Sequence, residues 1–306
     1  DRSVSRGLGD VYKRQIKLIV TDMDGTLLNY EDHISKENKE ALLAYQQNGT
    51  KVMLASGRGY LRLKPYIDEL HLNEYGGLLI ESNGTALYSC QKNERHIFEQ
   101  MTQQEAIQLF SLLEPFQTEI QFYFDSGVYY YFPQELVTFK KIERKQRNLP
   151  DDYPWMGGPW SWVNDTRNGY PDQKQIYSLS EIKQEKINKV NLSHDEQTIT
   201  RLLKEIKKVL PEHYHMVRTC PRMLEISLKS VSKGNALRYY MKKMNISPDE
   251  VIAFGDGEND ISMFKEIKYS VAMGNASDFV KRQASAITDT NENSGIAKYL
   301  IKFGNI

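Results

Sequence analysis

Acidic side chains follow an apolar segment at two widely separated places in this 306-residue sequence. Near the N-terminus, Asp22 and Asp24 stand one residue apart, directly after the apolar residues of IKLIVT (16–21). Far downstream, the apolar stretch VIAFG leads into GDGEND, which contains Asp256 and Asp260. Aspartate is rarely buried without a partner. Carboxylates placed this close to buried segments therefore indicate a bound cation, a catalytic site, or both.

A hydroxyl group and a lysine extend this set. The apolar segment KVMLAS ends at Ser56, and Lys233 lies in SKG, where Ser232 can cap the following helix. A lysine in the first helical turn gains nothing from the helix dipole, so Lys233 needs an anionic partner. Crowded carboxylates suit Mg²⁺, whereas a hydroxyl, backbone amides and a lysine suit a phosphate. Together these groups indicate phosphoryl transfer.

The elements that must bring these residues together can be predicted from local patterns. IKLIV and KVMLAS read as parallel strands covered on both faces, and a helix capped by Ser35 and closed at Gly49 connects them. A helix from Ser232 with an apolar face, which includes Met244, precedes the strand VIAFG. Ligands of open parallel sheets bind at the carboxyl ends of the strands. The acidic and phosphate-binding residues are therefore expected to converge at one edge of a sheet.

An isolated Asp-x-Asp is usually a loop, and SGR or SKG alone carries no information. DMDGTLLN directly after a buried strand is much more specific, and GDGEND after an apolar strand is moderately specific. The four in this order, each in its expected structural setting, resemble the haloacid-dehalogenase-like (HAD) superfamily of phosphohydrolases, in particular its Cof-type members with a type IIB cap. The matching segments are DMDGTLLN, LASGR, SKG and GDGEND, with SVAMGNA and AITDTNENSGIAKYL near the C-terminus. The resemblance implies an α/β fold in which a Rossmann-like parallel-sheet core carries an inserted α+β cap.

The resemblance also implies roles for individual residues. Asp22 would be the nucleophile that forms an aspartyl-phosphate, and Asp24 the general acid and base, with a raised pKa. Lys233 would clamp the phosphoryl oxygens, and Arg58 would either form a salt bridge or contact the substrate. The positions implied to hold Mg²⁺ are Asp22, Asp24 (through its backbone carbonyl), Asp256 and Asp260. Those implied to bind phosphate or substrate are Ser56, Gly57, Arg58, Lys233 and Asn259.

The expected domain organisation follows the motifs. Residues 1–15 lack a helical stripe and a signal-peptide core, and we interpret them as a non-native or disordered leader. Residues 16–84 and 226–306 would form the HAD core, and residues 85–225 the cap. Within the cap, EIQFYFDSGVYYYF predicts a hairpin, and the segment from INKVNLS to MLEISL predicts β-α-β-β.

Several features of the predicted cap have two interpretations. The segment 149–173 contains all three tryptophans, Trp155, Trp160 and Trp162. It could be a lid loop that stacks a substrate ring, although a local aromatic cluster is favoured. His213 and His215 alternate along a strand without a third metal ligand, so we interpret them as ordinary histidines.

Composition excludes some classes of function. Forty basic and forty acidic residues leave no net charge, so nucleic acid or a membrane surface is not an expected partner. Two cysteines, Cys90 and Cys220, are too few for a disulfide framework and suggest a reducing, cytoplasmic setting. No apolar run approaches the roughly 20 residues that span a bilayer. We expect a monomer or a weak homodimer.

The resulting hypothesis is a Mg²⁺-dependent phosphatase for small phosphomonoesters such as sugar phosphates, pyridoxal phosphate or flavin-type phosphates. A phosphomutase of the phosphomannomutase kind is the enzymatic alternative, for which Arg218 and Arg222 are a thin indication. A non-catalytic sensor of phosphorylated ligands is a further alternative, and the presence of both Asp22 and Asp24 argues against it.

Overall fold

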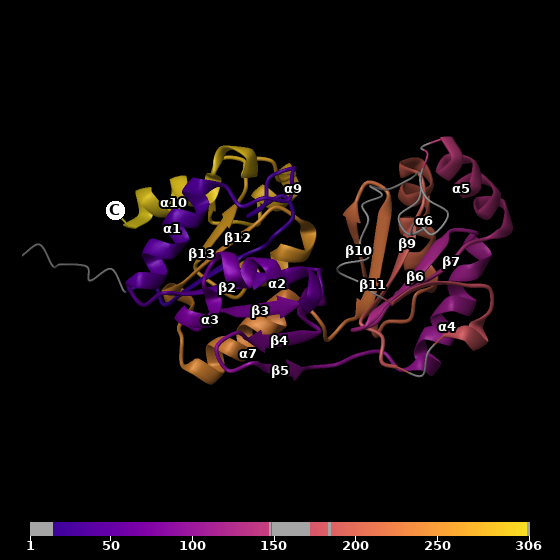
Figure 1. The fold of residues 1–306 in the computed structure, drawn as a ribbon, viewed down its shortest axis with the longest axis horizontal. Helices are drawn as coiled ribbons and strands as arrows, with labels where there is room; N and C mark the ends of the chain where they lie inside the picture. Colours follow the sequence, from indigo (N-terminus) through magenta and orange to yellow (C-terminus); the bar gives the residue numbers. More distant parts are fainter. Residues whose placement is uncertain (1–14, 147, 149–171, 183–184, 305–306) are drawn as a thin grey trace, which may run out of the picture.

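The computed structural model describes residues 15–146, 148, 172–182 and 185–304, and these residues form two β-sheets that lie side by side (Figure 1). The larger sheet has eight strands in the order β14-β13-β12-β1-β2-β3-β4-β5. The smaller has six in the order β10-β11-β9-β6-β7-β8. The chain makes most of the large sheet, crosses to the small one, and returns to finish the first. This confirms the predicted fold class, a parallel-sheet α/β core with an inserted α+β cap.

The parallel part of the large sheet contains the predicted strands. Its members are β1 (Leu18–Thr21), β2 (Lys51–Ala55), β3 (Leu78–Glu81), β12 (Val251–Gly255), β13 (Tyr269–Ala272) and β14 (Ala286–Ile287). β1 pairs in parallel with β2 on one side and β12 on the other, so the strands that precede the two acidic motifs are neighbours. Both are buried along their whole length, which explains their unbroken apolar sequences.

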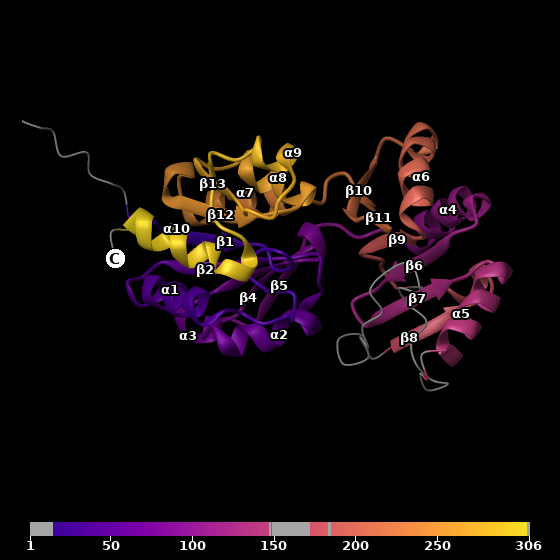
Figure 2. The ribbon, with the colours of Figure 1, turned by 90° about the horizontal axis from the view of Figure 1, so that it is seen from above.

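Helices cover both faces of the large sheet, and Figure 2 separates α7 and α8 on one side from α1, α2 and α3 on the other. Ile19 packs with the second group, whereas its neighbours Leu18 and Val20 pack with the first, because successive side chains of a strand point to opposite faces. The helices are α1 (Lys36–Gln47), α2 (Tyr60–Glu69), α3 (Leu72–Tyr75), α7 (Lys233–Met244), α8 (Ile261–Phe264), α9 (Asp278–Lys281) and α10 (Gly295–Gly304).

The predicted helix caps are confirmed. The side chain of Ser35 accepts a hydrogen bond from the amide of Asn38 at the start of α1, and Ser232 accepts one from Asn235 at the start of α7. One member of the predicted apolar face of α7 differs, since Met244 is exposed at the last helical position.

The small sheet consists of β6 (Glu119–Tyr123), β7 (Gly127–Tyr131), β8 (Asp172–Ile176), β9 (Lys189–Ser193), β10 (Tyr214–Cys220) and β11 (Met223–Leu228). Its helices are α4 (Gln103–Leu113), α5 (Gln134–Gln146) and α6 (Glu196–Val209). β6 and β7 form the predicted hairpin, and β9, α6, β10 and β11 form the predicted β-α-β-β unit. Short 3₁₀ helices complete the fold at Ser82–Gly84, Glu114–Phe116, Leu179–Glu181, Pro248–Glu250, Glu258–Asp260 and Asn291–Asn293.

The two faces of the small sheet differ in chemistry. On β9, Val190 and Leu192 enter an apolar core with α4 and α6, and β6 and β11 contribute apolar residues in the same alternation. The opposite face carries Lys189 and Asn191 on β9 and Glu225 on β11, all buried. A buried polar face needs hydrogen-bond partners. The six-stranded sheet therefore presents polar groups where its helices do not cover it.

Strands of both sheets extend past the expected domain boundaries. β4 (Ala86–Ser89) and β5 (Glu94–Ile97) extend the large sheet by antiparallel pairing, so the residues after 84 still belong to the core sheet. β11 continues to Leu228 in the small sheet, beyond the expected end at 225. The expected hairpin at Asn83 and Gly84 is present. The Trp-rich stretch up to residue 171 and residues 1–14 lie outside the described residues.

Candidate active site

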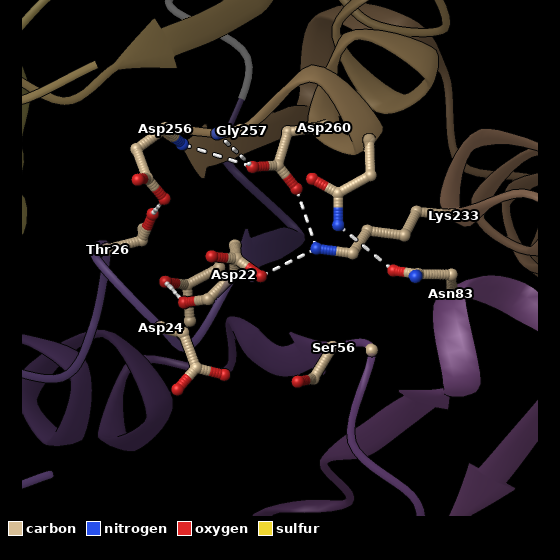
Figure 3. Close-up of polar contacts among 12 residues, drawn as sticks. Asp22, Asp24, Thr26, Ser56, Asn83, Lys233, Asp256, Gly257 and Asp260 are labelled. Atoms are coloured by element: carbon tan, nitrogen blue, oxygen red, sulfur yellow. Dashed lines mark hydrogen bonds and ion pairs between the residues drawn. The ribbon is translucent and has the colours of Figure 1, made fainter. Parts of the chain in front are cut away.

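The acidic residues predicted from the two motifs converge at the carboxyl edge of the large sheet. Asp22 follows β1 and Asp256 follows the adjacent β12. Lys233, the first residue of α7, places its Nζ 2.6 Å from Asp22 Oδ1 and 2.7 Å from Asp260 Oδ1 (Figure 3). Lys233 is 1% exposed and Asp260 is 0% exposed. The anionic partner that Lys233 was expected to need is thus a pair of carboxylates.

Backbone and hydroxyl donors fix two of the carboxylates. Asp260 Oδ2 accepts hydrogen bonds of 3.0 Å from the amides of both Asp256 and Gly257, which hold the turn after β12. Thr26 donates its hydroxyl to Asp256 Oδ1 at 2.8 Å. These contacts leave the carboxylates little freedom, so the arrangement is preorganised before any ligand binds.

The pKa values of the cluster reflect crowded negative charge. Burial, and then the charge of Asp260, raise the pKa of Asp22 well above its usual value, although Lys233 opposes the shift. The same two causes raise the pKa of Asp256 to about 6. Burial alone would lower the pKa of Lys233, but the negative charges of Asp22 and Asp260 and their hydrogen bonds outweigh burial, so the pKa of Lys233 is raised. One ammonium group therefore does not compensate three carboxylates.

This donor set fits a divalent cation. Asp22, Asp256 and Asp260 each offer a carboxylate oxygen, and these oxygens lie within 4.8 Å of one another. Oxygen donors with a net negative charge are what Mg²⁺ prefers in proteins. Within the described part of the chain this is the only such group of acidic, histidine or cysteine ligands, so His213 and His215 do not form one.

Asp24 lies in a different environment from Asp22. Figure 3 shows its side chain directed away from Asp256 and Asp260. Arg58 binds it with both Nε, at 2.9 Å from Asp24 Oδ2, and Nη2, and also contacts Asp32 at 2.7 Å. Burial raises the pKa of Asp24, but the hydrogen bonds and positive charge of Arg58 lower it by more, so the pKa lies below its usual value. The raised pKa expected for Asp24 is therefore not found in this arrangement. Of the two alternatives for Arg58, the structure shows the salt bridge.

Ser56, Gly57 and Asn259 border the acidic cluster. Ser56 directly follows β2 and is buried, and its Oγ accepts a hydrogen bond from the amide of Arg58 at 3.0 Å. Asn259 donates its side-chain amide to Asn83 Oδ1 at 3.0 Å. From the sequence, Asn83 was only a turn residue, and its position beside the motifs was not foreseen. Asn83 has a left-handed backbone, with φ of 58°, in the β3–β4 turn, and its side chain reaches Asn259 from there.

The site continues into a cavity of about 320 Å³ between the two sheets. Residues of the large-sheet side, including Asp22, Asp24 and Gly57, line one wall. The small sheet provides the other wall with Tyr123, Lys189, Asn191, Arg218, Thr219, Met223 and Glu225. Apart from Arg218, sequence reasoning did not identify these cap residues as part of the site. Polar residues at alternate positions of INKVNLS were a usable signal of a polar sheet face.

The sequence matches the family model of haloacid dehalogenase-like hydrolases over residues 19–300. This chain belongs to that family. Among its relatives, the phosphatase YwpJ of Bacillus subtilis is 28% identical over 92% of this chain and 98% of its own length. The 5-amino-6-(5-phospho-D-ribitylamino)uracil phosphatase YcsE of the same organism is 27% identical over 92% and 94%. The predicted family is therefore confirmed.

Solved structures of the HAD family agree with the fold. A haloacid dehalogenase-like hydrolase from Bacteroides thetaiotaomicron superposes with a TM-score of 0.72 at 26% identity, covering 94% of this chain and all of the other. The HAD subclass IIB sugar phosphatase BT4131 has a TM-score of 0.71 at 24% identity, covering 95% of this chain and 100% of its own. The second likeness concerns the fold, and it confirms the predicted cap type.

Family membership and the phosphatase relatives make this HAD protein a phosphoric monoester hydrolase that acts on small phosphate substrates. The buried acidic group fits the metal-ion dependence that is general in the superfamily. No described helix has the length and apolar character needed to cross a membrane.

Proposed function

We propose that this HAD hydrolase is a Mg²⁺-dependent phosphatase that works through an aspartyl-phosphate on Asp22. The observation that carries the proposal is the position of Asp22 at the end of β1, with Oδ1 held 2.6 Å from the buried Lys233 ammonium and with Asp256 beside it. A carboxylate held in place by a buried cation can attack phosphorus without first reorganising its surroundings.

Asp22 and Asp256 would hold the Mg²⁺ together with the backbone carbonyl of Asp24, while Asp260 would orient Lys233. When bound, the ion would offset negative charge on the phosphoryl group and on the carboxylates. The chain itself supplies the remaining contacts. Ser56, the Gly57 amide and Lys233 would bind phosphoryl oxygens, and Asn259 would hold the loop that carries Asp260.

Asp24 would transfer the proton, first to the leaving oxygen and then from the attacking water. Its contact with Arg58 favours the ionised carboxylate, which cannot donate a proton. We infer that the substrate phosphate competes for Arg58 when it binds. This would release Asp24 and raise its pKa toward the range that an acid needs, and Arg58 would then act as the substrate-binding residue implied by the family resemblance.

The lining of the cavity favours a hydroxylated leaving group. Lys189, Asn191 and Glu225 offer polar atoms on the cap side. Asn191 Oδ1 is buried and has no hydrogen-bond partner within the described residues, which is a costly state unless a ligand supplies a donor. Of the substrates expected from the sequence, sugar phosphates supply such hydroxyl donors most abundantly, so we place them ahead of pyridoxal and flavin-type phosphates.

The experiment is hydrolysis of p-nitrophenyl phosphate by the wild-type protein and by Asp22→Asn. Turnover should require Mg²⁺, stop with EDTA, and vanish in Asp22→Asn while the thermal unfolding transition persists. Asp68→Asn, which changes an exposed carboxylate on α2, is the matched control and should remain active. Turnover by Asp22→Asn at the wild-type rate would refute the assigned nucleophile.

A panel of phosphorylated metabolites then tests the leaving group, and sugar phosphates should have the highest kcat/KM. Isomerised sugar phosphate instead of free phosphate would identify the mutase alternative. Arg218, the residue that suggested it, donates a hydrogen bond to the carbonyl of Pro221 at 2.6 Å. Phosphate binding without any turnover would identify the sensor.

A further inference from the structure

A buried ion pair of the cap reaches the loops of the core. Lys189 begins β9 and Glu225 lies in the middle of the neighbouring β11, with Lys189 Nζ 2.6 Å from Glu225 Oε2. The two residues are 7% and 3% exposed. Both belong to the polar face of the small sheet and line the active-site cavity.

Each member of this pair also bonds to the large-sheet side. Lys189 Nζ donates to the backbone carbonyl of Gly57 at 3.0 Å. Glu225 Oε1 accepts the side-chain amide of Asn83, whose Oδ1 in turn accepts Asn259 Nδ2 at 3.0 Å. One polar chain therefore joins two cap strands to the loops that follow β2, β3 and β12.

The contacts leave little room around Gly57. A Cβ added at this residue would lie 3.3 Å from Asn83 Nδ2 and 3.5 Å from Lys189 Nζ. Gly57, the residue after Ser56, is thus held between a core turn and a cap cation. Any separation of the cap from the core breaks the Lys189 and Glu225 contacts with Gly57 and Asn83, and those groups then return to water.

We propose that Lys189 and Glu225 are positioning residues that set the phosphate-binding loop when the cap lies on the core. Lys189 orients the Gly57 carbonyl and, through the rigid Gly57–Arg58 peptide, the Arg58 amide that donates a hydrogen bond to Ser56 Oγ. Glu225 orients Asn83 and, through it, Asn259. The inference rests on the proposed function, because it assumes that Ser56 and the Gly57 amide bind the phosphate and that Asn259 holds the loop that carries Asp260.

The test uses variants of the pair and a matched control in the same domain. Lys189→Met removes the cation but keeps much of the side-chain volume, and Glu225→Gln is a second, milder variant. Lys140→Met is the control, because Lys140 on α5 forms a similarly buried 2.6 Å pair with Glu119 on β6. The double exchange Lys189→Glu with Glu225→Lys restores an ion pair within the cap, but it places a carboxylate against the Gly57 carbonyl.

The first measurement is turnover of p-nitrophenyl phosphate by the folded fraction of each variant. Lys189→Met removes a charge-assisted hydrogen bond, and the free energy of such a bond corresponds to a fall in kcat of about 10- to 100-fold. KM should change only a few-fold. Glu225→Gln should lower kcat less, and Lys140→Met should lower thermal stability without changing kcat. The double exchange should recover thermal stability but not kcat.

The second measurement is hydrogen–deuterium exchange of the peptide that covers residues 55–60, without metal or substrate. Exchange should be faster in Lys189→Met and in the double exchange than in the wild type or Lys140→Met. Recovery of kcat by the double exchange, unchanged kcat in Lys189→Met, or a rise in KM alone would overturn the positioning role. If the wild type does not turn over, the proposed function fails, and the exchange measurement still tests the contact.

Discussion

Gly84 provides the sharpest test of how the fold positions Lys233. This glycine ends the 3₁₀ turn between β3 and β4 and has φ of +109°. A Cβ at this position would lie 2.2 Å from the carbonyl oxygen of Ser232 and 3.0 Å from the amide nitrogen of Lys233. The turn therefore packs directly on the N-terminus of α7. We predict that Gly84→Ala impairs both stability and catalysis.

Two costs add in this variant. A non-glycine residue in the left-handed region costs about 1–2 kcal/mol, and forcing a methyl group into a filled space costs about 1–3 kcal/mol. The free energy of unfolding should thus fall by about 2–5 kcal/mol. Ordinary contact begins at 3.4 Å, so Ser232 must move by roughly 1 Å. A shift of ~1 Å in a catalytic group can cost ~100-fold in rate.

Gly49→Ala is the matched control for the backbone term. Gly49 has φ of +89° but no atom within 4 Å of an added Cβ, so only the left-handed penalty applies. Urea unfolding should give a loss of about 1–2 kcal/mol with unchanged kcat for p-nitrophenyl phosphate. If Gly84→Ala matches Gly49→Ala in both unfolding free energy and kcat, the close packing of the turn on α7 does not position Lys233, and the reasoning is refuted.

Two further predictions concern stability and thiol chemistry. Asp195 caps α6 by accepting a hydrogen bond from the Thr198 amide at 3.0 Å. Burial raises the pKa of Asp195, but hydrogen bonds from Thr198 outweigh this effect and lower the pKa to about 2. Asp195→Ala should lower the free energy of unfolding in urea by about 1 kcal/mol at pH 7. The difference in unfolding free energy between variant and wild type should shrink as pH falls from about 4 toward 2, where the folded carboxylate becomes protonated. An undiminished difference would contradict the capping role. Burial raises the pKa of Cys90 from 9.0 to about 12, so in a Cys220→Ser background its thiol should react with a disulfide reagent at pH 8 only after urea unfolding. Because the Cys90 thiol ionises at lower pH in the unfolded than in the folded chain, the free energy of unfolding should also fall as pH rises from 9 toward 12. Rapid labelling of Cys90 in the native protein would refute its burial.

The motifs and their local elements followed from the sequence. The unbroken apolar segments predicted strands buried on both faces, and Ser35 and Ser232 predicted the helix starts, because these signals act over a few neighbouring residues. Parallel strands also share a carboxyl edge, which was enough to predict that Asp22 and Asp256 meet. The roles of the site residues in catalysis stay predictions until the variants are measured.

Only the tertiary structure decided which partners these residues take. Arg58 binds Asp24 and thereby lowers its pKa, whereas the motif alone suggested a raised one. Asn83 lies in the site and bonds to Glu225 of the cap, and Lys189 of the cap bonds to the Gly57 carbonyl. The physical reason is that such contacts join side chains far apart in sequence, 132 residues in the case of Lys189 and Gly57. Their geometry depends on how two separately formed sheets pack together, which no local pattern records.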